Sequence, residues 1–461
     1  MNGEPWSLPG SWHWSTFSAV ARVASDLVDP MDYPDDPHIA PNHIERETGR
    51  LLPFATIAED GVMSAKHRFR AGQILYSKIR PYLAKAVVVD FDGLCSADMY
   101  PVETELDPRF LKWWMLTREF TRQAAGQQAR TILPKINKRA LGLLPVPVAP
   151  PDEQRRIVDI LEDHLSRLDA AESGIAFSVA RVASLKERVL SAGLLGETML
   201  GPREPCDLTD CGTDDGQLPD LPMGWSWRRL GDITDVVGGV TKDSKRQSDP
   251  AFLEVPYLRV ANVQRGRLDL GKVTSIRVPA SKAKALRLLP GDVLMNEGGD
   301  RDKLARGWVW DGQVEDCIHQ NHVFRARVVD GAIEPKLLSW AANTIGGRWA
   351  ERNGKQSVNL ASISLTKIRQ MPVPVPPKDV QPELVKQLDD RLQGCDRLIA
   401  NLNETLARAA TLRRSLLAAA FSGRLTGRSN DTLRARRSAG LAVEFGEVYR
   451  KILPETDINS L

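Results

Sequence analysis

The chain has 461 residues, enough for about three domains of ordinary size. Its 42% hydrophobic and 26% charged residues exclude a disordered or fibrous chain, and no apolar run reaches the roughly 18 residues that a membrane-spanning helix needs. The net charge of +3, from 62 basic and 59 acidic residues, neither indicates nor excludes a nucleic-acid partner, so local patches must decide that question.

The N-terminus and the cysteines bear on where the protein works. MNGEPWSLPGSWHW lacks the basic start and apolar core of a secretion signal. The five cysteines are scattered and odd in number, so they do not form a disulfide framework. We therefore expect a cytoplasmic protein.

The first half of the chain has the pattern of a mixed α/β domain over residues 1–150. QILYSKIRPYLAKAVVVDFDG, from Gln73, predicts two strands, and the tryptophan-rich LKWWMLTREF, from Leu111, predicts a helix. The segment 151–196 predicts a long helix, because it lacks proline beyond its start. Residues 197–220 are rich in Gly, Pro and Asp without periodicity, and we expect an acidic flexible linker there.

The second half repeats the first. LPVPVAPPDEQRRIVDILEDHL at Leu144 matches MPVPVPPKDVQPELVKQLDDRL at Met371, and this offset of 227 residues holds without a gap for about fifty positions. LPGSWHW at Leu8 likewise resembles LPMGWSW at Leu221. The repeat predicts a second globular domain over 221–377, a second long helix over 378–423 and a basic tail over 424–461.

The two long segments carry heptad patterns. In the first, apolar residues recur every seven positions, at Leu161, Leu168, Ile175, Val182 and Val189, and a second row falls on Ile157, Leu165, Val179 and Leu185. Sustained heptads of equal length predict that the two helices, each roughly 60 Å long, pack on each other as a coiled coil. Two unrelated amphipathic helices, each packing on its own domain, are the open alternative. Glycines at 196 and 423 stand where C-caps belong.

Catalytic motifs are absent from the sequence. It has no GxxxxGK[ST] phosphate loop, no GxGxxG after a predicted strand, no Asp/Asn-Pro-Pro-aromatic tetrapeptide of an amino-methyltransferase, and no GxSxG or HExxH. Cys317, His319 and His322 are metal-ligand types, but their spacing matches no zinc pattern, so a hydrogen-bonding loop is favoured over a metal site. We expect a non-catalytic chain.

Basic, amide and aromatic side chains cluster in both globular halves. Lys and Arg neutralise phosphates, while Arg, Asn and Gln pair with base edges, so these stretches predict DNA contacts. The alternative for any one stretch is a solvated face, and Arg80 could instead hold a strand pair. The candidates are Lys78, Arg80, Tyr82, Gln127, Gln128, Arg130 and Lys135 in the first half, and Lys242, Arg301, Lys303, Arg306, His319, Asn321, Lys355 and Gln356 in the second.

These features resemble the specificity subunits of Type I restriction-modification systems. The resemblance spans roughly residues 5–425 and rests on the LPxxW openings, the two proline-rich junctions, ILYSKIRPYLAKAVVVDFDGLCSADMY in the first half, and MNEGGDRDKLARGWVW with CIHQNHVFRAR in the second. The family pattern of Glu-Gln and a basic residue after the prolines is kept at Glu153–Arg155. The second copy has Val380, Gln381 and Pro382 instead, so we expect its helix to start differently.

The resemblance implies an α+β fold: two mixed α/β target recognition domains separated by two long antiparallel coiled-coil helices. It implies a bipartite, asymmetric double-stranded DNA target, and partners that are two methyltransferase (modification) subunits and ATP-dependent restriction subunits. S-adenosylmethionine and ATP with Mg would belong to those partners. A specificity module of another methyltransferase or phage-defence complex, or a coiled-coil scaffold without a DNA role, are the alternatives.

Overall fold

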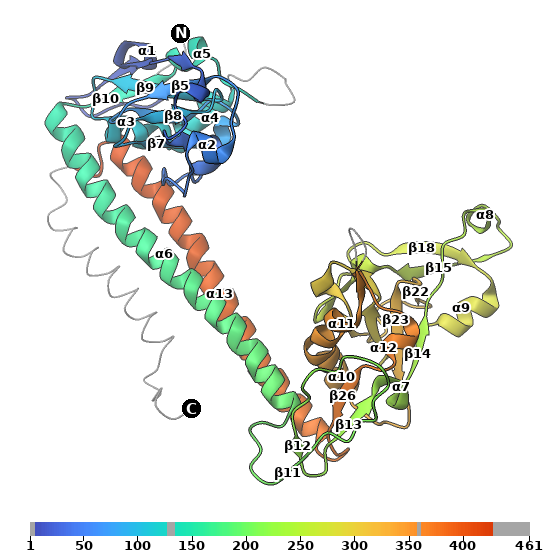
Figure 1. The fold of residues 1–461 in the computed structure, drawn as a ribbon. Helices are drawn as coiled ribbons and strands as arrows, with labels where there is room; N and C mark the ends of the chain where they lie inside the picture. The colour runs from blue at the N-terminus through green and yellow to red at the C-terminus, as the bar shows by residue number, and fades with distance from the viewer. Residues whose placement is uncertain (1–4, 127–133, 357–360, 427–461) are drawn as a thin grey trace. The chain divides into compact units, whose positions relative to one another are not determined.

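The computed structural model describes residues 5–126, 134–356 and 361–426. The chain divides into two compact units, unit 1 (1–175 with 404–461) and unit 2 (176–403). Two long helices, α6 (Pro151–Leu194) and α13 (Gln381–Phe421), each contribute one part to each unit (Figure 1). Within the described ranges, no helix combines the length and apolar content needed to cross a membrane.

Unit 1 contains two four-stranded sheets, of order β2-β9-β6-β7 and β3-β5-β8-β4, and the two-stranded pair β1–β10. The two strands predicted after Gln73 are confirmed, because β6 and β7 pair antiparallel with Ile74 opposite Val88. The strands are β1 (His13–Thr16), β2 (Ala21–Val23), β3 (Leu27–Val28), β4 (His38–Ile39), β5 (Lys66–Phe69), β6 (Ile74–Ser77), β7 (Ala86–Val88), β8 (Gly93–Cys95), β9 (Met99–Thr104) and β10 (Pro145–Val148).

The main core of unit 1 joins its sheet to the long helices. Trp114 of α3 is fully buried in one cluster with Leu161 of α6 and Phe421 of α13. The indole N–H of Trp114 donates to the carbonyl of Pro145 at 3.0 Å, which satisfies its only polar atom inside the core. The helices are α1 (Phe17–Val20), α2 (Ile57–Asp60), α3 (Pro108–Met115), α4 (Arg118–Gly126) and α5 (Lys138–Gly142), with short turns η1 (Pro30–Asp32), η2 (Pro41–His43) and η3 (Pro81–Leu83).

Unit 2 repeats this plan with a sheet of order β14-β23-β19-β21, smaller sheets β18-β15-β22 and β20-β25-β24, and the pairs β13–β26, β16–β17 and β11–β12. Its strands are β11 (Arg203–Glu204), β12 (Leu221–Pro222), β13 (Ser226–Arg229), β14 (Thr234–Gly238), β15 (Leu253–Leu258), β16 (Val263–Gln264), β17 (Arg267–Leu268), β18 (Thr274–Val278), β19 (Val293–Asn296), β20 (Gly298–Gly299), β21 (Gly307–Val309), β22 (Ile318–His319), β23 (Val323–Val328), β24 (Lys355–Gln356), β25 (Ala361–Ser362) and β26 (Pro372–Val375). Its helices are α7 (Leu230–Ile233), α8 (Ser244–Gln247), α9 (Ala280–Leu286), α10 (Pro335–Ala341), α11 (Gly347–Asn353) and α12 (Leu365–Ile368), with η4 (Val260–Asn262), η5 (Arg301–Lys303) and η6 (Ala342–Gly346).

The internal repeat is confirmed down to single hydrogen bonds. Gln154 accepts from the backbone N–H of Asp107 at 2.9 Å, and Gln381, 227 positions later, accepts from that of Glu334 at 2.6 Å. Each glutamine also donates to a carbonyl five residues before it, at 2.8 Å in both copies. These glutamines tie the start of each long helix to the N-terminus of a helix in its own domain, α3 in unit 1 and α10 in unit 2. The second long helix begins at Gln381, later than its counterpart Pro151, as the altered sequence predicted.

The long helices pack antiparallel within each unit. In unit 1 the Arg413 guanidinium pairs with Asp169 and Glu172, and in unit 2 Lys186 pairs with Asp396. The packing of the helices on each other is therefore confirmed. The heptad row is incomplete, however, because Leu185, which the periodicity places in the interface, is 49% exposed.

Glycine ends both long helices. Gly196 has φ +58° and Gly423 has φ +72°, the left-handed conformation that glycine adopts without steric cost. A Cβ at Gly196 would lie 2.5 Å from Pro222 Cγ, and a Cβ at Gly423 would lie 2.1 Å from Pro9 Cγ. Both predicted caps are confirmed, and each contacts the LPxxW opening of its own unit.

The expectation of a flexible linker over 197–220 is wrong. Asp215 accepts hydrogen bonds from Arg229 at 2.7 and 2.9 Å and from the indole of Trp349 at 2.9 Å. Burial alone would raise the pKa of Asp215, but the hydrogen bonds from Arg229 and Trp349 hold it below its usual value. Leu208 and Leu218 pack beside Trp225 and Trp227. The segment is a folded part of unit 2 because its aspartates and leucines have partners elsewhere in the chain.

Substitution of Gly394 by alanine is expected to stabilise the helix pair. Gly394 lies inside α13, and a Cβ there meets no atom within 4 Å. Glycine in a helix interior costs about 1 kcal/mol relative to alanine, so Gly394→Ala should raise the free energy of unfolding of unit 2 by about that amount. Urea denaturation followed by helix ellipticity measures it, and an unchanged or lower midpoint would contradict the prediction.

Candidate nucleic-acid interface

Backbone hydrogen bonds bring the candidate DNA-binding residues of the first half together. The N–H of Arg80 donates to the carbonyl of Pro134 at 2.8 Å, and the N–H of Ile136 donates to that of Lys78 at 3.0 Å. These bonds place Lys135 beside Lys78, Arg80 and Tyr82, although it stands more than fifty positions away in the sequence. We call Lys78, Arg80, Tyr82 and Lys135 the first basic cluster. Gln127, Gln128 and Arg130 lie outside the described residues.

The first basic cluster has two kinds of side chain. Burial lowers the pKa of Lys78, and its ammonium lies 5.2 Å from the centre of the Tyr100 ring, so it is partly enclosed. Arg80 is exposed at φ +46°, and among the described residues no hydrogen bond or ion pair holds its guanidinium. That exposure disfavours the alternative in which Arg80 holds the strand pair. Tyr82, on η3, is 51% exposed.

The candidates of the second half converge around a small sheet. β25 joins β20 to β24, so Lys355 and Gln356 lie across it from Gly298 and Gly299. Arg301 and Lys303 follow directly on η5, and the guanidinium of Arg301 donates to the carbonyl of Glu351 at 3.0 and 3.2 Å. These four side chains are therefore neighbours.

Two more candidates, Asn321 and Lys242, are placed near this sheet by the segment that follows β22. The N–H of Glu297 donates to the carbonyl of His322 at 3.0 Å, and the N–H of Asn321 donates to that of Val240 at 3.0 Å. Asn321 thus lies next to the strand that leads to β20, and Lys242 lies two residues beyond Val240. We call Lys242, Arg301, Lys303, Asn321, Lys355 and Gln356 the second basic cluster. Arg306, just before β21, is half-buried.

The prediction that His319 contacts DNA is wrong. Its side chain is 0% exposed, because β22 lies inside unit 2, and its Nδ1 lies 2.7 Å from the carbonyl of Val323. A group without exposed surface cannot reach a base edge. The residue types around His319 are those of a loop that contacts DNA bases. However, the pairing of Leu258 with His319 between two strands directs the His319 side chain towards the core.

His319 instead makes unit 2 sensitive to acid. Burial lowers its pKa from 6.5 to about 4, so below pH 6.5 the unfolded chain takes up a proton that the folded chain refuses. Its contribution to stability is therefore complete above pH 6.5 and is lost as pH falls towards 4, by about 1.4 kcal/mol per pH unit.

This pH dependence can be isolated by a variant. Urea midpoints of unit 2, followed by deuterium-pulse mass spectrometry of peptides covering 318–328, should fall more steeply from pH 7 to pH 5 in the wild type than in His319→Gln. Equal slopes for the two proteins would exclude His319 as the source.

Cys317, His319 and His322 do not form a metal site. Cys317 and His319 are buried, whereas His322 is exposed and its Nδ1 lies 2.6 Å from a carboxylate oxygen of Glu297. No group of three potential ligands occurs anywhere in the described ranges. The hydrogen-bonding role favoured for this segment agrees with the contacts of His319 and His322.

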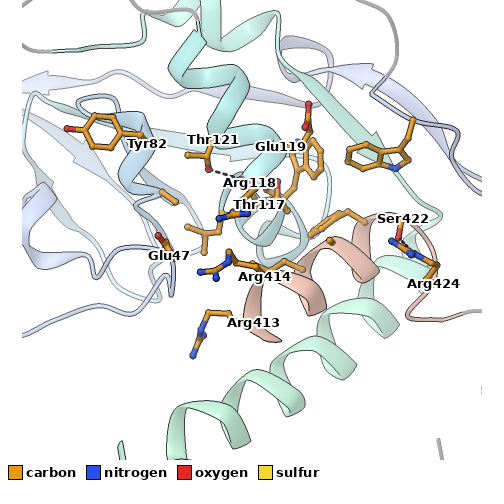
Figure 2. Close-up of a pocket in the computed structure, with 17 residues that line it drawn as sticks. Glu47, Tyr82, Thr117, Arg118, Glu119, Thr121, Arg413, Arg414, Ser422 and Arg424 are labelled. Atoms are coloured by element: carbon orange, nitrogen blue, oxygen red, sulfur yellow. Dashed lines mark hydrogen bonds between the residues drawn. The ribbon is translucent and has the colours of Figure 1, made fainter. Parts of the chain in front are cut away.

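A pocket in unit 1 was missed by the sequence analysis (Figure 2). It encloses about 580 Å³ between the α3–α4 region and the end of α13, and Tyr82 of the first basic cluster lines one side. The internal repeat could have indicated it, because Arg118 and Ser422 of its wall stand where unit 2 has Ile345 and Leu195.

Curated relatives of the chain are specificity subunits of Type I restriction enzymes. That of EcoDI from Escherichia coli is 48% identical over 196 residues, which cover 42% of this chain and 44% of the relative. That of StySPI from Salmonella potsdam is 22% identical over 371 residues, 78% of this chain and 75% of the relative. The stronger match thus spans less than half of the relative's length. No protein-family model matches the chain.

Solved structures share the fold. A chain from a structure of complex assembly and conformational transition in the type I R-M system has a TM-score of 0.70 at 21% identity, with 91% of this chain and 100% of that chain covered. The HsdS subunit from Thermoanaerobacter tengcongensis has a TM-score of 0.51 at 21% identity, with 92% and 100% covered. The expected α+β fold with two mixed domains and two long helices is therefore confirmed.

Proposed function

We propose, from its similarity to Type I restriction enzyme specificity subunits, that this chain reads a bipartite, asymmetric DNA sequence for a restriction-modification complex. The observation that carries the proposal is the repeat: the first half presents basic and aromatic side chains, and the second half basic and amide side chains, each from its own α/β domain. Residues 1–150 and 221–377 are the two target recognition domains in this proposal. Phosphate contacts would position each domain, and base-edge contacts would give the sequence.

The two half-sites should differ, because the two clusters differ. The first basic cluster stands on the β6–β7 connection and presents Tyr82, whereas the second stands on η5 and β24 and presents Asn321 and Gln356. Amide side chains and an aromatic ring recognise different features of DNA. We expect half-site centres about 10 bp apart, since both domains must face the same side of the duplex.

Catalysis belongs to partner subunits in this proposal. Two methyltransferase subunits, with S-adenosylmethionine, and restriction subunits, with ATP and Mg, would bind a non-catalytic chain in the cytoplasm. Phe177 and Leu185 of α6 support a docking role, because they are 64% and 49% exposed and stand eight residues apart on one helix face. Apolar side chains exposed along one stripe favour contact with a partner helix.

Single-molecule methylation sequencing tests the proposal. DNA is sequenced from cells that express this chain with the methyltransferase of its gene neighbourhood, and from cells that express the methyltransferase alone. We expect one bipartite motif with unequal halves that requires this chain. Methylation that is unchanged without the chain, or a palindromic or continuous motif, would contradict it.

Substitution of an exposed residue tests which half of the DNA motif the domain of unit 1 recognises. Arg80→Ala should relax the sequence of one half of the motif only, because a bidentate base contact is worth about 1–3 kcal/mol. Arg22→Ala is the matched control, since Arg22 is an exposed arginine of unit 1 paired with Glu103 outside the cluster. A uniform loss of methylation across sequences would make Arg80 a phosphate contact instead.

A further inference from the structure

The pocket of unit 1 combines an apolar floor with a cationic rim (Figure 2). Trp114 and Phe421 are buried residues of its lining, and Arg118, Arg414 and Arg424 stand around it with two carboxylates, Glu47 and Glu119, so that cationic groups outnumber anionic ones. Its 580 Å³ is ample for several side chains of a peptide. The chemistry of the walls therefore selects a segment that carries apolar and acidic residues together.

Two buried donors at this pocket have unused hydrogen-bonding capacity. Arg413 is 94% buried, and its Nη2 pairs with Asp169 and Glu172, but its Nη1 contacts no acceptor in the described part of the chain. The indole nitrogen of Trp6 is likewise buried without an acceptor there. Buried donors are costly when unpaired, so an acceptor bound in the pocket would be stabilising.

In unit 2 the corresponding surface is covered. Ile345 and Leu195, the counterparts of Arg118 and Ser422, are 7% and 6% exposed. The cover comes from the segment after the Gly196 cap, whose Leu208 and Leu218 pack on this surface. The segment that follows a long helix thus folds back onto the domain beside the helix end.

Only the last part of that cover has a counterpart among the described residues of unit 1. The indole of Trp227 donates to the carbonyl of Pro219 at 3.0 Å, and the indole of Trp14 donates to that of Trp6 at 2.9 Å. Trp6 therefore takes the place of Pro219. Leu208 and Leu218 have no counterpart in the described part of unit 1, and the pocket lies on the surface that they would cover.

We propose that residues 441–449, LAVEFGEVY, bind in this pocket as the inter-repeat segment binds in unit 2. The tail starts at the pocket: Arg424 lines it, and the hydroxyl of Thr426 donates to Glu153 at 3.0 Å. Phe445 stands 22 residues beyond Gly423, the same distance at which Leu218 follows Gly196. Glu444 and Glu447 flank it and would match the arginines of the rim, of which Arg118 stands where unit 2 has the apolar Ile345.

Tethering makes a modest affinity sufficient. A flexible tether as long as residues 427–440 would supply an effective concentration of about 1 mM, so a site with a Kd of about 0.1 mM would be roughly 90% occupied. The contact is intramolecular, and it is independent of DNA and of the proposed function.

Site-specific photo-crosslinking of the full chain tests the proposal. p-Benzoylphenylalanine replaces Tyr82, which is 51% exposed at the pocket wall, and in a matched control it replaces Met63, which is 81% exposed elsewhere in unit 1. We expect crosslinks from position 82 to residues 441–449 at about ten times the control yield, the ratio of bound to free tail under this tethering. Phe445→Asp should reduce the yield to that of the control, whereas Leu433→Asp, outside the proposed segment, should not.

Salt and isotope labelling complete the test. The yield should fall as salt rises, because charge pairs at the rim are screened. In a mixture of ¹⁴N and ¹⁵N chains, crosslinked peptides should be of one isotope, since the contact is within one chain. Crosslinks at the control level, crosslinks to residues 1–4, or mixed-isotope crosslinks would each overturn the proposal.

Discussion

Replacement of Gly307 by alanine is expected to lower the free energy of unfolding of unit 2 by at least about 3 kcal/mol. An ideal Cβ at Gly307 would lie 1.6 Å from the carbonyl oxygen of Leu294, which is backbone and cannot move alone. Gly307 pairs with Met295 in the β19–β21 ladder. The side chain of the buried Asn343 also bonds its N–H at 3.0 Å and its carbonyl at 2.8 Å. Accommodating a methyl group therefore separates β21 from β19 and strands the amide of Asn343.

Hydrogen exchange of peptides covering 293–309 measures this loss. Gly394→Ala is the matched control, because it makes the same chemical change in the same unit and is expected to have the opposite sign. Exchange in unit 1 peptides, such as those covering 74–88, should remain unchanged, since the damage is confined to one sheet. Wild-type protection at 293–309 in Gly307→Ala would contradict the close approach of the two strands.

The parts of the fold that follow a period were predictable. Heptads predicted α6 and α13, and an offset of 227 residues predicted that both units repeat one plan. Gly196 and Gly423 were predictable as helix ends, because no other residue adopts positive φ at so little cost. These features depend on sequence neighbours or on spacing, which a single sequence contains.

Features that depend on distant partners were not predictable. The segment 197–220 has the composition of a flexible linker. Hydrogen bonds from Arg229 and Trp349, which are more than a hundred positions apart, make Asp215 a partly buried anchor. Leu185 fits the second heptad row, but its side chain is half exposed. Periodicity indicates which face of a helix is apolar, but it does not indicate which element packs on that face.

The candidate interface likewise has features that the sequence predicts and features that depend on distant partners. Residue type identified Arg80 and Lys135, but only the pairing of Ile79 with Lys135 brings them together. Residue type also selected His319, and there it failed, because the core of unit 2 accepts a neutral histidine bonded to a backbone carbonyl. Composition thus indicates which side chains can bind DNA, while exposure decides which are available.

Charge reversal in the second basic cluster is expected to reduce DNA affinity strongly. Arg301, Lys303 and Lys355 are neighbours, and Arg301 and Lys355 are exposed. If the three side chains contact phosphates, the triple change to glutamate removes about three released counterions and adds repulsion, which lowers affinity roughly a hundredfold at moderate salt. The slope of log affinity against log salt should become shallower by about 2.7.

A second triple variant separates contact from net charge. Lys272, Lys282 and Lys284 are exposed lysines of unit 2, and the last two lie on α9, outside the second basic cluster. Reversing them changes the net charge of the chain by the same amount, so a long-range effect of charge would weaken both variants equally. Contact predicts a large loss and a shallower slope for the cluster variant alone.

Binding is measured by fluorescence anisotropy on the complex assembled with its partner subunits, using the motif that methylation sequencing identifies. Equal losses of DNA affinity in the two variants would mean that the second basic cluster contributes only through the long-range electrostatic field of the protein. The surface of unit 2 that recognises bases would then have to lie elsewhere.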